Sequence, residues 1–470
     1  MIFDEFLEKI NELNVYEKIA LYEKNKKMTY GELIEGIYSR RKMFESLDVK
    51  AVGIWATNST DWATFFLEAF FSDVSIFVFP IKMFERDIKT YCEDYNIQIL
   101  LTDSGFIYPK KVYSKNILTN KVVLFSSGST GRPKGIVLSK SALWGNASSI
   151  VKYMNLTTQD KILIVKSLYH SSTISGELLL GIISGITVRI YTGAFFSRKI
   201  IETINSESIS VMGGTPSIFL SMIDKVNRCK LSKIMISGSF TSPKVLAFTS
   251  EYFMCQVYHV YGLTEAGPRV TYLPPQFIKS KGESIGIPID NVNVDIVNEA
   301  GEIVRDGETG ELLVKSDYLM DCYLDDPILS RKKLTSKGLY TGDMGYRDQE
   351  GYLYLSGRKD DMICRSGENI WPSTIDNTML KVTGVYESFT IGIKDEYLSQ
   401  RIVTILRVSK EFQKREIYVQ CRKDMVQSPD DIFILDEIPK LPNGKYDREK
   451  IKNIINTSKM GKEEGRIWDK

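Results

Sequence analysis

The amino-acid sequence predicts an α/β protein with a large N-terminal domain and a small, mobile α+β C-terminal domain. Through about the first 340 residues, short β-branched and aromatic runs alternate with helical patterns, as at 121–127 and 161–167. Alternation of this kind predicts parallel-rich sheets covered by helices. Several of the runs are apolar throughout, which is typical of strands that are buried on both faces.

The pattern changes near Asn291, where short strands separated by Gly, Asn and Asp turns predict a small β-rich subdomain. A charged stretch follows Gly357 and precedes a compact α+β segment. We therefore expect an N-terminal domain over 1–357, a hinge over 358–361 and a C-terminal domain over 362–470.

Composition narrows the class of protein. The 470 residues include 61 basic and 59 acidic side chains, and a net charge of +2 gives no support for nucleic acid or an anionic membrane as partner. Six scattered cysteines without a CxxC pair argue against a disulfide framework or a zinc site. The acidic, amphipathic N-terminus is no secretory signal, and the most apolar stretch, 64–80, is interrupted by Glu68 and Asp73. We expect a cytoplasmic protein without a membrane span.

A glycine- and hydroxyl-rich loop follows the apolar run at 122–125. Glycines at this density let backbone N–H groups converge on an anion, and the hydroxyls and a lysine add donors. The loop is not a Walker A sequence, because its lysine is followed by Gly135. It predicts a phosphate cradle, and a plain Gly/Ser surface loop is the alternative. The candidate ligands are Ser126, Ser127, Gly128, Ser129, Thr130, Gly131 and Lys134.

The loop is similar to a signature of the adenylate-forming superfamily, which includes acyl- and aryl-CoA synthetases, peptide-synthetase adenylation domains and luciferases. Further segments resemble the superfamily's other motifs, in the same order along the chain. Together they cover residues from about 120 to 450 and argue against a coincidental match. These segments are Tyr261–Gly267, Gly310–Leu312, Tyr340–Asp343, Gly357–Asp361 and Pro439–Lys445.

The resemblance implies an ATP site. Tyr261 would stack on adenine, Thr264 would contact the α-phosphate, and Glu265 would hold Mg²⁺. Asp343 would bind the ribose hydroxyls, and Arg358 would also reach the nucleotide. The residue types suit these tasks, because ATP needs a carboxylate-bound Mg²⁺ and a carboxylate can accept two ribose hydroxyls. Gly238, Ser239 and Gly262 complete the expected nucleotide site, although 237–239 reads Ser-Gly-Ser where the family commonly has Gly-Gly-Ala.

The resemblance also implies two half-reactions. A carboxylate first displaces pyrophosphate from ATP, with Lys445 as the adenylation lysine. The C-terminal domain then turns about Asp360, withdraws Lys445 and lines a pantetheine channel with Gly367. The region before the phosphate loop is shorter than in most members, so phosphopantetheine on a carrier protein stays open beside CoA as the acceptor.

The acid is an aryl or fatty acid on this reading. His170 resembles the aromatic gate beside the substrate carboxylate, whereas His259 reads as structural. Gly213, Gly214 and Gly262 would line the acyl pocket with His170. An α-amino acid is disfavoured, because no acidic residue follows His170 until Glu177. We therefore expect an ATP-dependent acid–thiol ligase. A stand-alone amino-acid adenylating enzyme remains open, as does a catalytically inactive binding protein, against which the retained motif residues argue.

Overall fold

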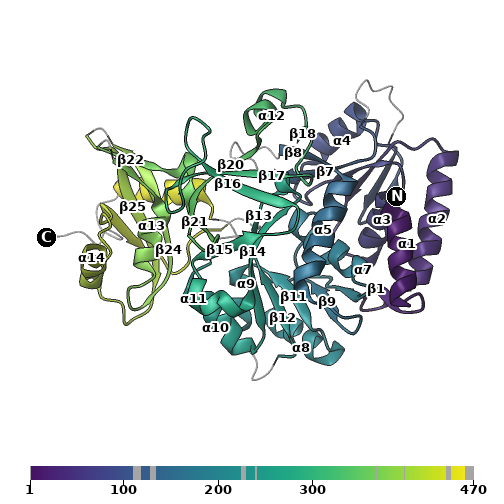
Figure 1. Ribbon diagram of the computed structural model, residues 1–470, viewed down its shortest axis with the longest axis horizontal. Coiled ribbons are helices and arrows are strands. Elements are labelled where there is room, and N and C mark those ends of the chain that lie inside the picture. The colour runs from purple at the N-terminus through teal and green to yellow at the C-terminus, as the bar shows by residue number, and fades with distance from the viewer. Residues whose placement is uncertain are drawn as a thin grey trace.

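The computed structural model describes residues 2–109, 118–126, 134–223, 229–238, 241–366, 368–395, 397–440 and 446–460 (Figure 1). Within these residues the strands form two large sheets and two small ones. The predicted α/β class is confirmed.

The largest sheet has fourteen described strands, with β19 paired to β20 beside the order β16-β17-β20-β21-β15-β14-β13-β12-β11-β9-β10-β1-β2. The strands from β13 to β1 along this order run parallel, as the sequence predicts. The strands are β1 Ile19–Glu23, β2 Lys26–Thr29, β9 Lys161–Ile164, β10 Thr187–Ile190, β11 Val211–Gly214, β12 Lys233–Ile236, β13 Gln256–Gly262, β14 Arg269–Leu273, β15 Ser284–Pro288, β16 Val292–Val297, β17 Gly310–Ser316, β19 Leu334–Thr335, β20 Gly338–Arg347 and β21 Leu353–Arg358.

The predicted β-rich subdomain is present, but its strands continue the parallel sheet instead of forming a sheet of their own. β14 runs antiparallel to β13, and β15 and β21 extend the ladder from there to β20, β17 and β16. The reason is that β14 reverses direction directly after β13, so the chain stays at the same sheet edge. This arrangement carries residues of β20 and β21 to the end of β13.

The second sheet has the order β18-β8-β7-β4-β3-β5-β6. β7 runs parallel to β4 and antiparallel to β8, which follows it along the chain. The last strand, β18, returns from much later in the sequence and pairs with β8. The strands are β3 Ala51–Trp55, β4 Ser75–Val78, β5 Ile99–Thr102, β6 Gly105–Ile107, β7 Lys121–Ser126, β8 Lys134–Ser139 and β18 Cys322–Tyr323.

One hydrophobic core joins the two large sheets. It includes Ile54 and Val122 of the second sheet and Ile162 and Val188 of the first, with α5 packed between them (Figure 1). The helices of this part are α1 Ile2–Leu13, α2 Tyr30–Ser46, α3 Thr60–Phe70, α4 Glu85–Asp94, α5 Lys140–Met154, α6 Ser171–Thr173, the π-helix η1 Ile174–Leu179, α7 Leu180–Ile183, α8 Ser197–Glu207, α9 Pro216–Met222, α10 Pro243–Phe253, η2 Thr264–Ala266, η3 Pro275–Phe277, α11 Ile278–Lys281 and α12 Pro327–Lys333.

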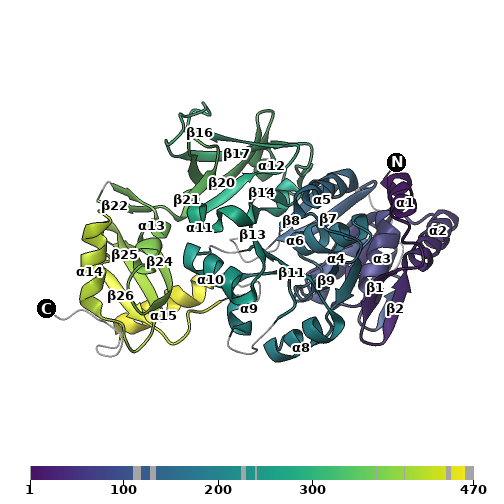
Figure 2. The same cartoon turned by 60° about the horizontal axis from the view of Figure 1, so that its bottom comes forward.

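After β21, the chain forms a separate group of elements, at the left of Figures 1 and 2. The sheet β24-β25-β26 has one hydrophobic cluster on each face. Ile402 of β25 packs with residues of α13 and α14, whereas Val403 packs with residues of α15. The elements are η4 Lys359–Asp361, β22 Ile363–Arg365, β23 Glu368–Ile370, α13 Pro372–Met379, β24 Val385–Asp395, β25 Ser399–Val408, α14 Lys414–Lys423, β26 Asp431–Ile434 and α15 Arg448–Met460.

None of the described helices combines enough residues with enough apolar character to cross a bilayer.

Candidate active site

The candidate site lies where the parallel strands end. β9, β11, β12 and β13 point the same way, so their carboxyl ends meet at one edge of the sheet. His170 follows β9, Gly213 and Gly214 end β11, Gly238 follows β12, and Thr264 follows β13. Ligands of open α/β sheets bind at such an edge. The structure therefore brings these predicted residues to one side of the molecule.

The ends of the phosphate loop are fixed by a β-hairpin. Ser126 ends β7 and lies opposite Lys134, which begins β8, in an uninterrupted antiparallel register. The loop between them is outside the described residues, as are the other predicted positions in the list that follows. These positions are Ser127, Gly128, Ser129, Thr130, Gly131, Ser239, Gly367 and Lys445.

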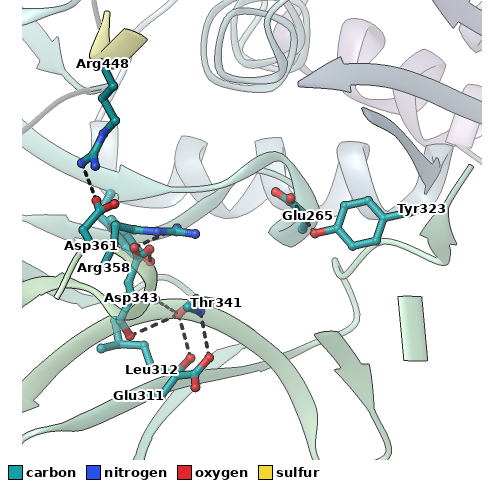
Figure 3. A network of polar contacts seen from close by, with 11 residues as sticks. Glu265, Glu311, Leu312, Tyr323, Thr341, Asp343, Arg358, Asp361 and Arg448 are labelled. Atoms are coloured by element: carbon teal, nitrogen blue, oxygen red, sulfur yellow. Dashed lines mark hydrogen bonds and ion pairs between the residues drawn. The ribbon is translucent and has the colours of Figure 1, made fainter. Parts of the chain in front are cut away.

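The predicted magnesium ligand, Glu265, lies in η2 beside this hairpin. The Tyr323 hydroxyl donates to Glu265 Oε1 at 2.8 Å, and Met320 N–H donates to the Glu265 carbonyl at 2.8 Å (Figure 3). Tyr323 is a residue of β18 and lies opposite Ile136 of β8. Burial and the neighbouring Glu265 carboxylate raise the pKa of Tyr323, which keeps its hydroxyl protonated as a donor. The carboxylate is thereby held next to the strand that begins at Lys134.

The residues present fit a magnesium ion that arrives with ATP. No group of three or more His, Cys, Asp or Glu side chains in the described ranges forms a metal cage. Mg²⁺ is commonly held by one or two carboxylates together with substrate phosphates and waters. Glu265 supplies such a carboxylate, positioned beside the phosphate hairpin.

Thr264 and the segment after β9 are in direct contact. Ser171 Oγ lies 2.9 Å from Thr264 Oγ1. His170 precedes Ser171 at the start of α6, and its half-buried ring lies 4.3 Å from the ring of Tyr169. His170, the predicted gate residue, is thus next to the residue that contacts Thr264, the predicted α-phosphate residue. His259, in contrast, is buried, and its ring Nδ1 lies 3.1 Å from the carbonyl oxygen of Ser284.

Tyr261, Asp343 and Arg358 meet in a second cluster. The Tyr261 hydroxyl donates to Asp343 Oδ2 at 2.5 Å, and Arg358 Nη1 lies 2.9 Å from Asp343 Oδ1. Burial raises the pKa of Tyr261 far above its ordinary value, and the Asp343 charge raises it further. A carboxylate has about four lone-pair positions, so Asp343 keeps capacity for two ribose hydroxyls. The contacts orient the carboxylate for that task.

A turn before Asp343 is held by residues of the Gly310–Leu312 motif. Gly342 adopts a φ of +79° and donates its N–H to Glu311 Oε1 at 2.9 Å. Thr341 Oγ1 donates to the Leu312 carbonyl at 2.9 Å (Figure 3). Lys359 Nζ lies 3.1 Å from Glu311 Oε2. Glu311 and Leu312 therefore hold the turn that precedes Asp343, the predicted ribose residue.

The glycines of the expected acyl pocket are crowded by the protein itself. A Cβ at Gly262 would lie 2.0 Å from the Pro268 carbonyl oxygen. A Cβ at Gly213 would lie 2.6 Å from Glu177 Oε1, and one at Gly214 would lie 2.7 Å from the ring of Phe219. The sequence analysis expected these small residues to make room for substrate. In the structure, the space above Gly213 holds a carboxylate.

The hinge residues connect to the last helix. Asp360 is exposed in η4, and its neighbour Asp361 accepts from Arg448 Nη2 at 2.5 Å (Figure 3). Arg448 begins α15, directly after the segment that contains Lys445. Tyr446 donates to Glu387 Oε1 at 3.0 Å. The end of the Lys445 segment is thus tied to the hinge and to β24.

Several of these residues escaped the sequence analysis. Tyr323, Ser171 and Lys166 carry no motif signal, because their contacts to the site arise only when distant segments meet. Lys333 is another, since a Cβ at Gly342 would lie 2.9 Å from its Nζ. Glu177 was noticed only as the first acid after His170.

The sequence and fold match known proteins. The pattern of the family described as AMP-binding enzyme matches residues 119–324. The 2-succinylbenzoate–CoA ligase of Bacillus subtilis strain 168 is 26% identical over 470 residues, which cover 93% of this chain and 95% of that protein. The indoleacetate–CoA ligase of Aromatoleum aromaticum is 28% identical over 346 residues, which cover 72% of this chain and 68% of that protein.

This chain resembles the AMP-binding enzyme family, whose pattern matches residues 119–324. The fold agrees. The Bacillus subtilis o-succinylbenzoate CoA synthetase in complex with its acyl-adenylate intermediate superposes with a TM-score of 0.80 at 23% identity, covering 95% of this chain and 97% of that one. An anthranilate CoA ligase in complex with anthranoyl-AMP gives a TM-score of 0.83 at 18% identity, with 97% and 98% covered.

The expected class of AMP-forming acid–thiol ligase is confirmed. The resemblance to acyl- and aryl-CoA synthetases is confirmed as well. The Bacillus subtilis synthetase has also been solved with ATP and a magnesium ion, and that structure superposes with a TM-score of 0.80.

Proposed function

We propose that this protein is an ATP-dependent acid–CoA ligase that activates an aryl or fatty acid. The observation that carries the proposal is the meeting of two clusters at the end of β13. One cluster joins Glu265 and Thr264 to the phosphate hairpin and to the residue after His170. The other joins Tyr261 to Asp343 and Arg358. Their chemistry suits the phosphates and the nucleoside of one ATP molecule.

In the first half-reaction, an oxygen of the substrate carboxylate attacks the α-phosphorus. The new P–O bond forms as the bond to the bridging oxygen breaks, and pyrophosphate leaves with the electron pair. Lys134 and the loop hydroxyls would bind the leaving group, and the Thr264 hydroxyl would donate to an α-phosphate oxygen. Asp343 would hold the ribose, so that the nucleotide cannot slide along the site. When bound, Mg²⁺ supplies positive charge against the phosphate oxygens.

Lys445 would add the mobile cation of this step. A charge aimed at a developing oxyanion contributes about 3–4 kcal/mol, or two to three decades in rate. The contacts that support its delivery are the Arg448–Asp361 ion pair and the Tyr446–Glu387 hydrogen bond, which hold the chain after it.

In the second half-reaction, the sulfur of the acceptor attacks the acyl carbon. A C–S bond forms, the C–O bond to AMP breaks, and the thiol proton passes to solvent. We propose a hinge over 358–361 between a domain at 1–357 and a domain at 362–470, which turns about Asp360 and brings Gly367 toward the pantetheine arm. Exchange of domain positions between steps is a common gating device.

CoA is the proposed acceptor. The relatives named above are CoA ligases, and the Bacillus subtilis enzyme matches this chain over nearly the full length of both proteins. A phosphopantetheinylated carrier protein would offer the same thiol arm, and the test below distinguishes the two. The named relatives act on 2-succinylbenzoate and indoleacetate, both aromatic acids, which favours an aryl acid here.

ATP–pyrophosphate exchange tests the proposal. The purified enzyme is assayed with aryl, fatty and amino acids, and we expect exchange with at least one aryl or fatty acid. Thioester is then measured after addition of CoA or of a phosphopantetheinylated carrier protein, and we expect it with CoA. Absence of exchange with every acid would refute the ligase, and thioester on the carrier alone would refute the acceptor.

Lys445→Ala separates the half-reactions. We expect a loss of exchange of about two to three decades, because the cation for the leaving group is gone. Thioester formation from supplied acyl-adenylate should stay within about threefold of wild type, since that step has no pyrophosphate to release. Equal losses in both assays would contradict the assignment.

A further inference from the structure

A buried ion pair lies outside the nucleotide clusters. Lys166 Nζ, after β9, is 2.7 Å from Oε1 of Glu177, which is part of the π-helix η1. Their side chains are 10% and 1% exposed. Ion pairs this deep are costly to build, and a pair of apolar residues is often as stable or more so. π-Helical turns are frequent at functional sites.

The pair lies on the side of the candidate site where the substrate acid is expected to bind. The Glu177 carboxylate occupies the space directly above Gly213, at the carboxyl end of β11. Lys166 Nζ also donates to Ser172 Oγ at 3.3 Å, and Ser172 is next to Ser171, which contacts Thr264. The ion pair is therefore two residues and two hydrogen bonds away from the predicted α-phosphate contact.

The backbone around Lys166 is held in place. The Asn58 side chain donates to the Lys166 carbonyl at 2.8 Å and accepts from Leu168 N–H at 2.8 Å. These two hydrogen bonds clamp the segment between β9 and His170. The lysine is thus held in the interior by its own backbone contacts and is not a surface side chain that has folded inward.

The Glu177 carboxylate has unused acceptor capacity. Lys166 Nζ, 2.7 Å away, is the charged partner of Oε1, and among the described residues Oε2 accepts no hydrogen bond. A carboxylate can accept about four hydrogen bonds, and buried acceptors are nearly always satisfied. Burial raises the pKa of Glu177, and the Lys166 charge opposes that rise. The missing partner is a hydrogen-bond donor.

We propose that Glu177 and Lys166 determine substrate specificity, by selecting a carboxylic acid with a hydroxyl or amino group remote from its carboxylate. The inference rests on the proposed ligase function and names its substrate class. The remote group would donate to Glu177, while a hydroxyl oxygen or amine lone pair could accept from Lys166. An acid with only hydrocarbon at that end would leave the carboxylate unsatisfied. An acid with a second carboxylate would place like charge against Glu177.

Matched acids test this selection. Each hydroxy- or aminobenzoate is compared with the methylbenzoate of the same ring position and with the corresponding benzenedicarboxylate, by kcat/KM for pyrophosphate release. ω-Hydroxy fatty acids are compared with fatty acids one carbon longer. We expect the hydroxyl or amino member to be favoured about 10- to 100-fold in at least one set, because a buried acceptor is satisfied only by that member.

Two variants locate the selection in the ion pair. In Glu177→Gln, whose amide still accepts, the preference should fall about tenfold. In the double variant Lys166→Met/Glu177→Leu, which replaces the pair by apolar side chains, the preference should reverse toward the methyl member. The double variant carries the test if the single variant fails to fold, because apolar replacement of a buried pair is usually tolerated. Glu68→Gln is the matched control, since Glu68 is 8% exposed and pairs with Arg40 at 2.8 Å in another part of the molecule.

The outcomes separate the two proposals. No activity of wild type with any acid would refute the ligase function itself, and the inference with it. Activity with a preference for methyl or dicarboxylate members would leave the ligase intact and overturn the inference. So would an unchanged preference in both pocket variants, or an equal change in Glu68→Gln.

Discussion

Tyr323 holds Glu265 from a strand that lies 58 positions later in the chain. A carboxylate that binds Mg²⁺ must present its oxygens in a fixed direction, and a hydroxyl hydrogen bond provides that direction without adding charge. The Asp343 carboxylate is oriented in a similar way by Tyr261, with Arg358 on the other oxygen. Both acidic residues of the site therefore depend on a tyrosine.

Tyr323→Phe tests this dependence. We expect the Mg²⁺ concentration for half-maximal exchange to rise about tenfold, because partners that orient metal ligands typically contribute that much to metal affinity. The measurement is exchange rate against free Mg²⁺ at saturating ATP and acid. Tyr95→Phe is the matched control, since the Tyr95 hydroxyl donates to another carboxylate, Asp325, at 2.5 Å. The same Mg²⁺ shift in both variants would contradict a specific effect on Glu265.

Among the secondary-structure elements, α13 and β24 are joined by a carboxylate. Asp376 Oδ1 of α13 accepts from the hydroxyls of Ser388 and Thr390 on β24, each at 2.7 Å. Burial raises the pKa of Asp376 to about 6, and the two hydroxyls counteract only part of the rise.

The raised pKa makes stability depend on pH. The folded protein binds the Asp376 proton more tightly than the unfolded chain, whose carboxyl has an ordinary pKa near 3.8. The stabilising contribution is therefore complete below about pH 4 and is lost as pH rises through about 6. Asp376→Asn keeps an acceptor but cannot ionise. The difference in free energy of unfolding between Asp376→Asn and wild type should shift in favour of the variant by about 2–3 kcal/mol as pH rises from 4 to 8, measured by urea unfolding.

Asp424→Asn provides a control of opposite sign. Lys381 Nζ lies 2.8 Å from Asp424 and lowers the pKa of that carboxyl. Its stabilising contribution is present above the ordinary pKa and is lost as pH falls. The free energy of unfolding of Asp424→Asn should therefore decrease relative to that of wild type as pH rises. A flat difference for Asp376→Asn across the same range would contradict the assignment.

At the scale of the whole molecule, the ion pair between Arg448 and Asp361 joins the predicted hinge to the residues that follow Lys445. Burial raises the pKa of Asp361, and the charge and hydrogen bond of Arg448 oppose that rise. The Asp361 carboxylate therefore relies on Arg448 to stay ionised. Lys244 of α10 adds a contact between the two parts of the chain, donating to the Leu380 carbonyl at 3.2 Å. These contacts hold the C-terminal elements in their present position.

Arg448→Met should affect the half-reactions unequally. We expect exchange to fall about five- to tenfold, because Lys445 loses a fixed connection to the hinge. Thioester formation from supplied acyl-adenylate should be unchanged. The double variant Asp361→Asn/Arg448→Met should recover part of the exchange, since no unpaired carboxylate remains. Equal losses in the two assays, or no recovery in the double variant, would refute this coupling.

The sequence was informative wherever function depends on neighbours along the chain. Local motifs marked the hairpin flanks Ser126 and Lys134, the Thr264–Glu265 pair and Asp343. The structure pairs the two flanks across β7 and β8, joins Thr264 to Ser171 and joins Asp343 to Tyr261. The continuous sheet from β13 to β16 was missed, because strand partners are chosen by tertiary packing. Glu177 above Gly213 was missed for the same reason.

The register of β7 and β8 ties the position of Lys134 to the packing of the sheet. Side chains alternate in β8, with Ile136 and Leu138 in the main core and Val137 in the cluster on the other face. A one-position slip of the ladder would exchange these two faces and move Lys134 from its place opposite Ser126. The apolar side chains of β8 therefore help to fix where the cation of the predicted phosphate site lies.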